Sequence, residues 1–206
     1  MNAFVEAARQ IVRSLVWADS TIPYVSHAGR QLAWRHHGLG MLQAELSETL
    51  RIHVWHPRLV SPQMAWPRCV HDHRFDFISA VVVGAVRDVK PEVRPRGDTP
   101  AAQLTGGWQP AKSYEYSDST YRAGDAYEMK RRVFHTTETD TLAVTVIHRS
   151  NFDDRLARVV CAPDSDVTAV SGIVRDESLD HQILVNSVLS EAARAIRALD
   201  ALKGPR

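Results

Sequence analysis

Cys69-Val70-His71-Asp72-His73 is the most informative stretch of this chain. Side chains on an extended strand point alternately to its two faces, so His71 and His73 would present both imidazoles on the same face. Two imidazoles on one face are suited to bind a metal ion together with a third ligand. His135, which lies shortly before the apolar run 142–147, is the candidate for that ligand. The pattern therefore predicts a three-histidine metal site.

The spacing of these histidines resembles the two-part motif of the cupin superfamily. In the first part, His71 and His73 take the two histidine positions and Gly84 takes the closing glycine position. In the second part, Gly124 takes the opening glycine position and His135 takes the histidine position. The resemblance implies an all-β cupin fold, a double-stranded β-helix or jelly-roll barrel.

Departures from the cupin motif indicate which branch of the superfamily the chain resembles. Phe77 stands where the motif has its metal-binding glutamate, and Lys130 and Arg132 stand at the proline and glycine positions of the second part. Without the glutamate, the site would consist of three neutral imidazoles. Such a site is similar to that of the thiol dioxygenase branch of the cupins, which includes cysteine dioxygenase. This likeness implies Fe(II) as the cofactor.

Several further residues are candidates for the chemistry of such a site. Arginines would bind an anionic substrate, and aromatic side chains on inward strand positions would line the cavity. The candidates for substrate binding are Arg51, Arg74, Trp55, Phe77 and Arg149, and those for acid or base catalysis are Tyr127, His53 and Cys69. Simpler interpretations are a structural ion pair for Arg74, plain core for the aromatic residues and a small buried hydrophobe for Cys69. Asp72, with opposite strand parity, is expected to point away from the metal.

Two functions remain open from the sequence. The first is a non-haem Fe(II)-dependent oxygenase that inserts oxygen from O2 into a small thiol, amino acid or carboxylate. The alternative is a non-oxidative metallo-cupin, either a zinc or nickel isomerase or lyase, or a small-molecule sensor. Imidazole ligands suit iron, zinc, nickel and copper alike, so the ligand type does not identify the metal.

Composition excludes other classes of protein. The chain has 206 residues, of which 44% are hydrophobic and 24% charged, as expected for one folded domain with a sizeable core. Its 25 basic and 24 acidic residues leave a net charge of +1, so no global field attracts nucleic acid or an anionic membrane. No apolar stretch approaches the roughly 20 residues of a membrane helix. Two cysteines and a charged N-terminal segment favour a cytoplasmic location.

The expected elements follow from the hydrophobic periodicity. Apolar residues at three-and-four spacing predict a helix within residues 1–25 and another at 176–203. Short runs of β-type residues between turn residues predict a barrel core over residues 31–160. The proline- and glycine-rich segment 90–110 is expected to be a long loop, either a plain surface loop or a lid. A homodimer could form through edge strands or terminal segments.

Overall fold

The computed structural model describes residues 2–18, 24–60, 70–91, 93–95, 108–110, 116–154, 157 and 178–201. Two helices flank the β-structure along the chain, α1 (Asn2–Ser14) and α2 (Leu179–Ala201). The largest sheet is antiparallel and six-stranded, in the order β12 (Ala126–Met129), β7 (Asp76–Val83), β14 (Ala143–Ser150), β6 (Leu50–Val60), β5 (Leu39–Glu45) and β4 (Arg35–His37).

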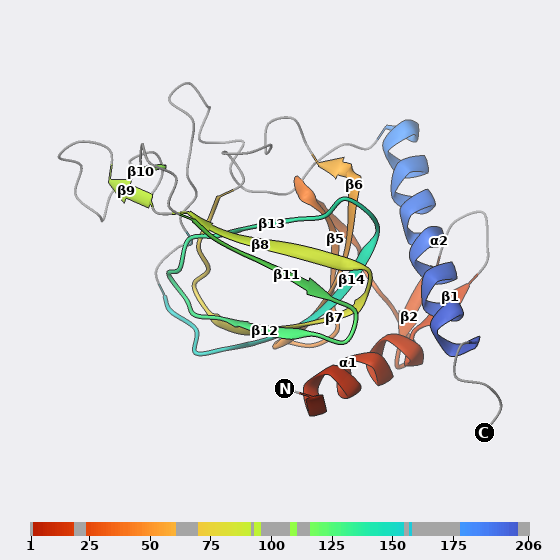
Figure 1. The fold of residues 1–206 in the computed structure, drawn as a ribbon. Helices are drawn as coiled ribbons and strands as arrows, with labels where there is room; N and C mark the ends of the chain where they lie inside the picture. Colours follow the sequence, from red (N-terminus) through yellow and green to blue (C-terminus); the bar gives the residue numbers. More distant parts are fainter. Residues whose placement is uncertain are drawn as a thin grey trace.

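A second, three-stranded antiparallel sheet lies across from the first one (Figure 1). Its order is β11 (Tyr116–Arg122), β8 (Ala85–Pro91) and β13 (Thr136–Glu138). Val86 of this sheet packs in one buried cluster with Trp55, Val81 and Ile147 of the six-stranded sheet. The predicted fold class, an all-β jelly-roll barrel with a helix at either end, is confirmed.

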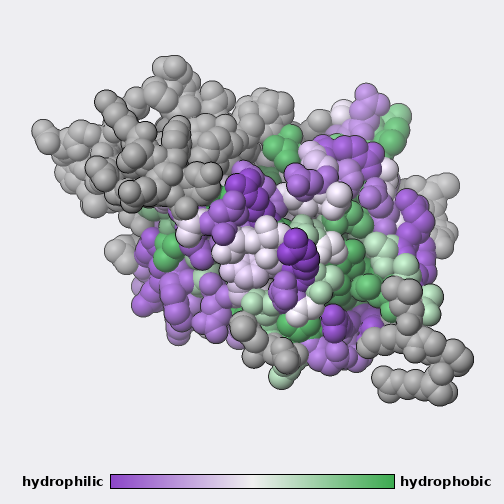
Figure 2. All heavy atoms as spheres, viewed as in Figure 1, coloured by the Kyte–Doolittle hydropathy of each residue, from purple (hydrophilic) through white to green (hydrophobic). Residues whose placement is uncertain are grey.

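All strands of the large sheet except the short β4 supply side chains to two different cores. On β6, Ile52 and Val54 point to an outer core, while Trp55 belongs to the inner core between the sheets. The outer core also contains apolar residues of both helices, namely Val5, Ala8, Val12, Val188, Leu189, Ala192 and Ile196. These residues cover the outer face of the sheet. Burial of each valine, leucine or isoleucine side chain contributes about 1.5–3 kcal/mol to the stability of the fold. Figure 2 shows hydrophobic residues gathered between the barrel and α2 on one face.

The N-terminal helix is shorter than the predicted segment 1–25. It ends at Ser14, whose hydroxyl donates to the carbonyl of Ile11 at 2.7 Å. The chain then continues as β1 (Val16–Ala18), which pairs antiparallel with β2 (Tyr24–His27). A third strand, β3 (Arg30–Gln31), completes this small sheet. Strand pairing of the β-prone residues after Ser14 therefore replaces the last predicted helical turns.

Two other predictions of local structure need correction. One of the short β-type runs predicted for the barrel core, residues 78–89, is divided at Gly84 into β7 and β8, which belong to different sheets. The predicted loop 90–110 contains the paired short strands β9 (Val93–Pro95) and β10 (Trp108–Pro110). Residues 92 and 96–107, on which the proposed lid depends, lie outside the described residues. The C-terminal helix agrees with the predicted range 176–203 to within a few residues.

Neither α1 nor α2, nor any other helical segment in the described part of the chain, is long and apolar enough to cross a membrane.

Candidate metal centre

The two motif segments meet through their backbones. His71 and His135 form an isolated antiparallel bridge, in which each backbone N–H donates to the other residue's carbonyl at 2.9 Å. His135 immediately precedes β13, so the three-stranded sheet holds this residue in place. Residues 72 and 73 belong to no strand, which corrects the assumption of an extended strand over residues 69–74. The prediction that Asp72 points away from the metal still holds, because its side chain is fully buried and pairs with Arg132.

The three imidazoles converge as the sequence predicts. One ligand atom from each of His71, His73 and His135 can be chosen so that all lie within 4.8 Å of one another. His73 Nε2 and His135 Nε2 are 2.9 Å apart. Two nitrogens bound to one metal at about 2.0–2.1 Å lie at most about 4.2 Å apart, so this separation is compatible with a shared ion. The donor set therefore fits a divalent metal ion.

Aromatic rings surround the cluster on the side of His73. The ring of Phe75 lies 5.1 Å from that of His73, and the ring of Phe77 lies 5.0 Å away in an edge-on arrangement. Phe77 is also 6.0 Å from His135, so an apolar ring occupies the place of the motif's carboxylate. Burial, with smaller contributions from His71 and His135, lowers the pKa of His73 well below its usual value. The neutral imidazole that results is the form that binds metals.

Asp88 orients His135, and we did not identify it from the sequence. Its Oδ1 lies 2.7 Å from His135 Nδ1, and both side chains are buried. Because a carboxylate accepts hydrogen bonds, Nδ1 carries the proton and Nε2 presents its lone pair to the cluster. The second oxygen of Asp88 forms an ion pair with Lys90 at 3.3 Å, though not in hydrogen-bond geometry. In the sequence, the only signal was an aspartate in the β-type run between Val86 and Val89, and its burial is visible only in the structure.

We expect Asp88→Asn to weaken metal binding by about 10–100-fold, the usual range for a residue that supports a metal ligand. The amide can present an N–H where the carboxylate accepts a hydrogen bond, so His135 loses its fixed tautomer and part of its basicity. Competition with a coloured chelator measures the affinity. Asp118→Asn, in the same sheet and paired with Arg87, is the matched control. Equal affinities for the two variants would show that Asp88 has no role at the site.

Two of the predicted acid–base residues lie inside the barrel. Tyr127 is buried, its ring is 6.1 Å from Phe77, and its pKa is raised by burial and by the charge of Asp88. Its hydroxyl therefore stays protonated and can donate a hydrogen bond, whereas release of its proton is unfavourable. His53 is buried, and its Nε2 has no hydrogen-bond partner among the described residues. Cys69, the third predicted residue, lies outside the described residues.

The predicted substrate residues occupy different environments. Trp55 is part of the inner core and donates from Nε1 to the hydroxyl of Thr145 at 3.1 Å. Arg149 is buried, its guanidinium lies 5.4 Å from the ring of Phe75, and burial lowers its pKa. Arg51 pairs with Glu45 at 2.8 Å, whereas Arg74 is exposed. Of the three arginines, Arg149 is thus the one in contact with Phe75, whose ring lies against His73.

Acid should destabilise the metal-free protein through His53. Burial lowers the pKa of His53 from 6.5 to about 3, so the unfolded state binds one more proton between these values. Stability then falls as the pH drops below 6.5, by about 1.4 kcal/mol per pH unit for one such group. Urea unfolding between about pH 4.5 and 6 measures this slope, which should be smaller in His53→Gln by that amount. Parallel pH profiles for both proteins would contradict the buried, neutral state of His53.

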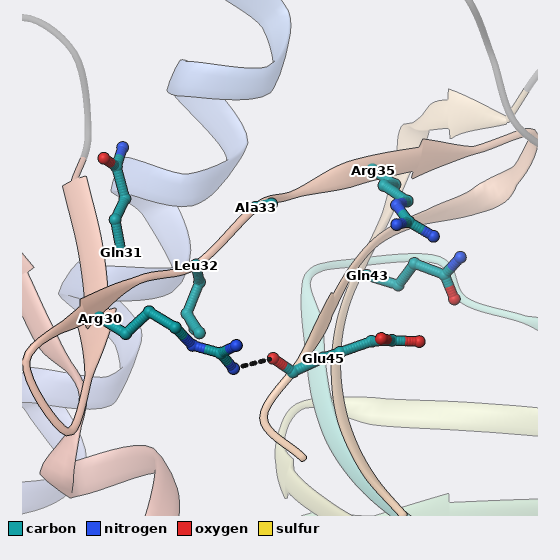
Figure 3. Close-up of a pocket in the computed structure, with 7 residues that line it drawn as sticks. All are labelled: Arg30, Gln31, Leu32, Ala33, Arg35, Gln43 and Glu45. Carbon is teal, nitrogen blue, oxygen red and sulfur yellow. Dashed lines mark hydrogen bonds between the residues drawn. The ribbon is translucent and has the colours of Figure 1, made fainter. Parts of the chain in front are cut away.

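A cavity of about 150 Å³ lies away from the histidine cluster, beside β3, β4 and β5 (Figure 3). Its lining residues are Arg30, Gln31, Leu32, Ala33, Arg35, Gln43 and Glu45. Arg30 donates to the backbone carbonyl of Glu45 at 3.4 Å across it. None of the three histidines lines this cavity, so we do not assign it to the metal site.

Comparisons with known proteins relate the chain to cupin structures. No protein-family model matches the sequence, and no curated protein matches it. Among solved structures, the cupin domain of Drosophila melanogaster CENP-C is 16% identical, with a TM-score of 0.39, and the match covers 66% of this chain and 86% of that domain. A variant of Bacillus subtilis oxalate decarboxylase is 11% identical with a TM-score of 0.35, covering 58% of this chain and 28% of its own.

A formate complex of Lactobacillus farciminis oxalate decarboxylase is 10% identical, with a TM-score of 0.34, and the match covers 80% of this chain and 47% of that one. The chain thus spans less than half the length of either decarboxylase. With these low identities and TM-scores the matches carry no argument about the site, and we interpret the site from its own geometry.

Proposed function

We propose that this protein is a cupin-type metalloenzyme, an Fe(II)-dependent oxygenase that acts on a small thiol, amino acid or carboxylate. The convergence of His71, His73 and His135, with no carboxylate ligand among the residues that the structure describes, carries this proposal. Three protein ligands leave further positions of a six-coordinate ion for a substrate and O2. The 2.9 Å separation of His73 Nε2 and His135 Nε2 supports a metal ion shared by these two side chains.

Residues around the cluster would share the remaining tasks. When bound, the iron would supply a Lewis-acidic centre that brings substrate and oxygen together. Phe75 and Phe77 would exclude water from the His73 side, which strengthens electrostatic interactions inside the site. The protonated hydroxyl of Tyr127 would donate a hydrogen bond, and the Nε2 of His53, which has no hydrogen-bond partner among the described residues, would bind a polar substrate group. Arg149 would attract a carboxylate group of the substrate.

The second candidate is a non-oxidative metallo-cupin that uses zinc or nickel for isomerase or lyase chemistry. The buried Asp88–His135 hydrogen bond favours it, because carboxylate–histidine pairs commonly support zinc ligands. The two candidates differ in the identity of the metal ion and in the coordination positions that it leaves open for substrate and O2. Both predict metal bound by the same three histidines.

Metal content and oxygen uptake distinguish the candidates. The protein is purified without oxygen, its metals are measured by elemental mass spectrometry, and O2 consumption is followed with Fe(II) and a panel of small thiols, amino acids and carboxylates. About one iron per chain and substrate-dependent uptake are the expected results. Uptake that remains in His73→Ala would come from free iron and would contradict the proposal. Bound zinc or nickel without uptake would favour the second candidate.

A further inference from the structure

Arg132 has a backbone conformation that arginine rarely adopts. Its φ is +66°, in the left-handed region where a β-carbon is unfavourable and glycine is the usual residue. The cupin motif also has a glycine at this position. A glycine would adopt the conformation without strain, so the contacts of the arginine side chain must offset a cost that glycine would avoid.

The contacts of Arg132 converge on the segment that carries two metal ligands. Its backbone N–H donates to the carbonyl of His73 at 3.0 Å. Its Nη1 lies 3.8 Å from Oδ2 of Asp72, the residue between His71 and His73. Its Nε donates to Asp153 at 3.1 Å, and Nη2 lies at the same distance from that carboxylate. Arg132 thus binds the ligand segment through both its backbone and its side chain.

Asp72 makes this arrangement sensitive to the loss of the guanidinium. The Asp72 side chain is fully buried, and a buried carboxylate is costly without a cationic or hydrogen-bonding partner. Removal of the Arg132 guanidinium would break its ion pair with Asp72, which lies between His71 and His73. The segment that carries these two ligands would then lose one of the two contacts by which Arg132 constrains it.

We propose that Arg132 is a positioning residue of the metal site. Through Asp72 and the His73 carbonyl it holds the His71–His73 segment in its metal-binding geometry before the metal arrives. Asp153 supports it, since its carboxylate fixes the guanidinium and its backbone N–H donates to the carbonyl of Arg74 at 2.6 Å. The inference rests on the proposed metal site and is independent of the oxygenase reaction.

Three variants test the role of Arg132. Arg132→Asn removes the guanidinium but keeps a residue that tolerates the left-handed region. Arg132→Lys keeps a positive charge near both aspartates, and Arg131→Asn makes the same change at the neighbouring arginine, whose side chain donates to the carbonyl of Asn151. Binding of Co(II) is measured by chelator competition and by its visible spectrum, which depends on the ligand geometry. Amide hydrogen exchange of the metal-free protein follows the His71–His135 bridge.

Arg132→Asn should weaken Co(II) binding by about 10-fold or more, alter the Co(II) spectrum and speed amide exchange at His71 and His135. Arg132→Lys should recover part of the affinity, and Arg131→Asn should keep the wild-type values. Wild-type affinity and exchange in Arg132→Asn would overturn the proposal, as would equal losses in the two Asn variants. Absence of Co(II) binding to the wild type would overturn both this inference and the metal site. Normal Co(II) binding without O2 uptake by the iron form would overturn only the oxygenase assignment.

Discussion

His135→Ala is expected to abolish stoichiometric metal binding while the two-sheet fold persists. The substitution removes one of three ligands, so the loss should exceed the roughly 100-fold upper range for a supporting residue. The fold should survive because none of the three histidines belongs to the large outer core that joins the sheet to both helices. Elemental mass spectrometry measures the metal content, and circular dichroism measures the fold.

His73→Ala should also lose the metal, but with a smaller loss of stability. His135 is buried against Asp88, so its removal leaves a buried carboxylate short of a hydrogen bond, at a cost of about 1–3 kcal/mol. The His73 side chain is only partly buried, and its ring neighbours are aromatic. His148→Ala, a histidine of β14 outside the cluster, is the control. One metal per chain in either ligand variant would refute the ligand assignment.

The ligands could be predicted from the sequence because two local rules locate them. Alternation along an extended segment puts His71 and His73 on one side, and motif spacing brings in His135. The backbone bridge between His71 and His135 supplies the same geometry without a regular strand. Phe77 follows the same logic, since its motif position places it against the cluster.

The supporting residues could not be predicted in this way. Asp88 is 47 positions from His135, and the two meet only because β8 pairs with β13. In the sequence Arg132 is only a departure from the glycine of the motif, because its positive φ and its contact with Asp72 depend on tertiary structure. Local sequence patterns show which residues share one face of a strand. They do not show which buried carboxylate meets which imidazole.

Gly84→Ala is expected to destabilise the protein by about 3 kcal/mol or more. Gly84 has a φ of +70° and connects β7, which carries Phe77, to β8, which carries Asp88. A β-carbon there would lie 2.1 Å from the carbonyl oxygen of Leu142. That oxygen belongs to the backbone and cannot rotate away as a side chain would, so the strands themselves must move. Urea unfolding of the metal-free protein measures the loss.

Gly29→Ala separates the two causes of this loss. Gly29 has a similar φ of +75°, but a β-carbon there would meet nothing within 4 Å. This control should therefore lose only the conformational term, about 1–2 kcal/mol. The additional loss in Gly84→Ala then measures the steric conflict with Leu142, and movement of β8 should also weaken metal binding through Asp88. If the two variants proved equally stable, the close approach of Gly84 to Leu142 would not constrain the fold.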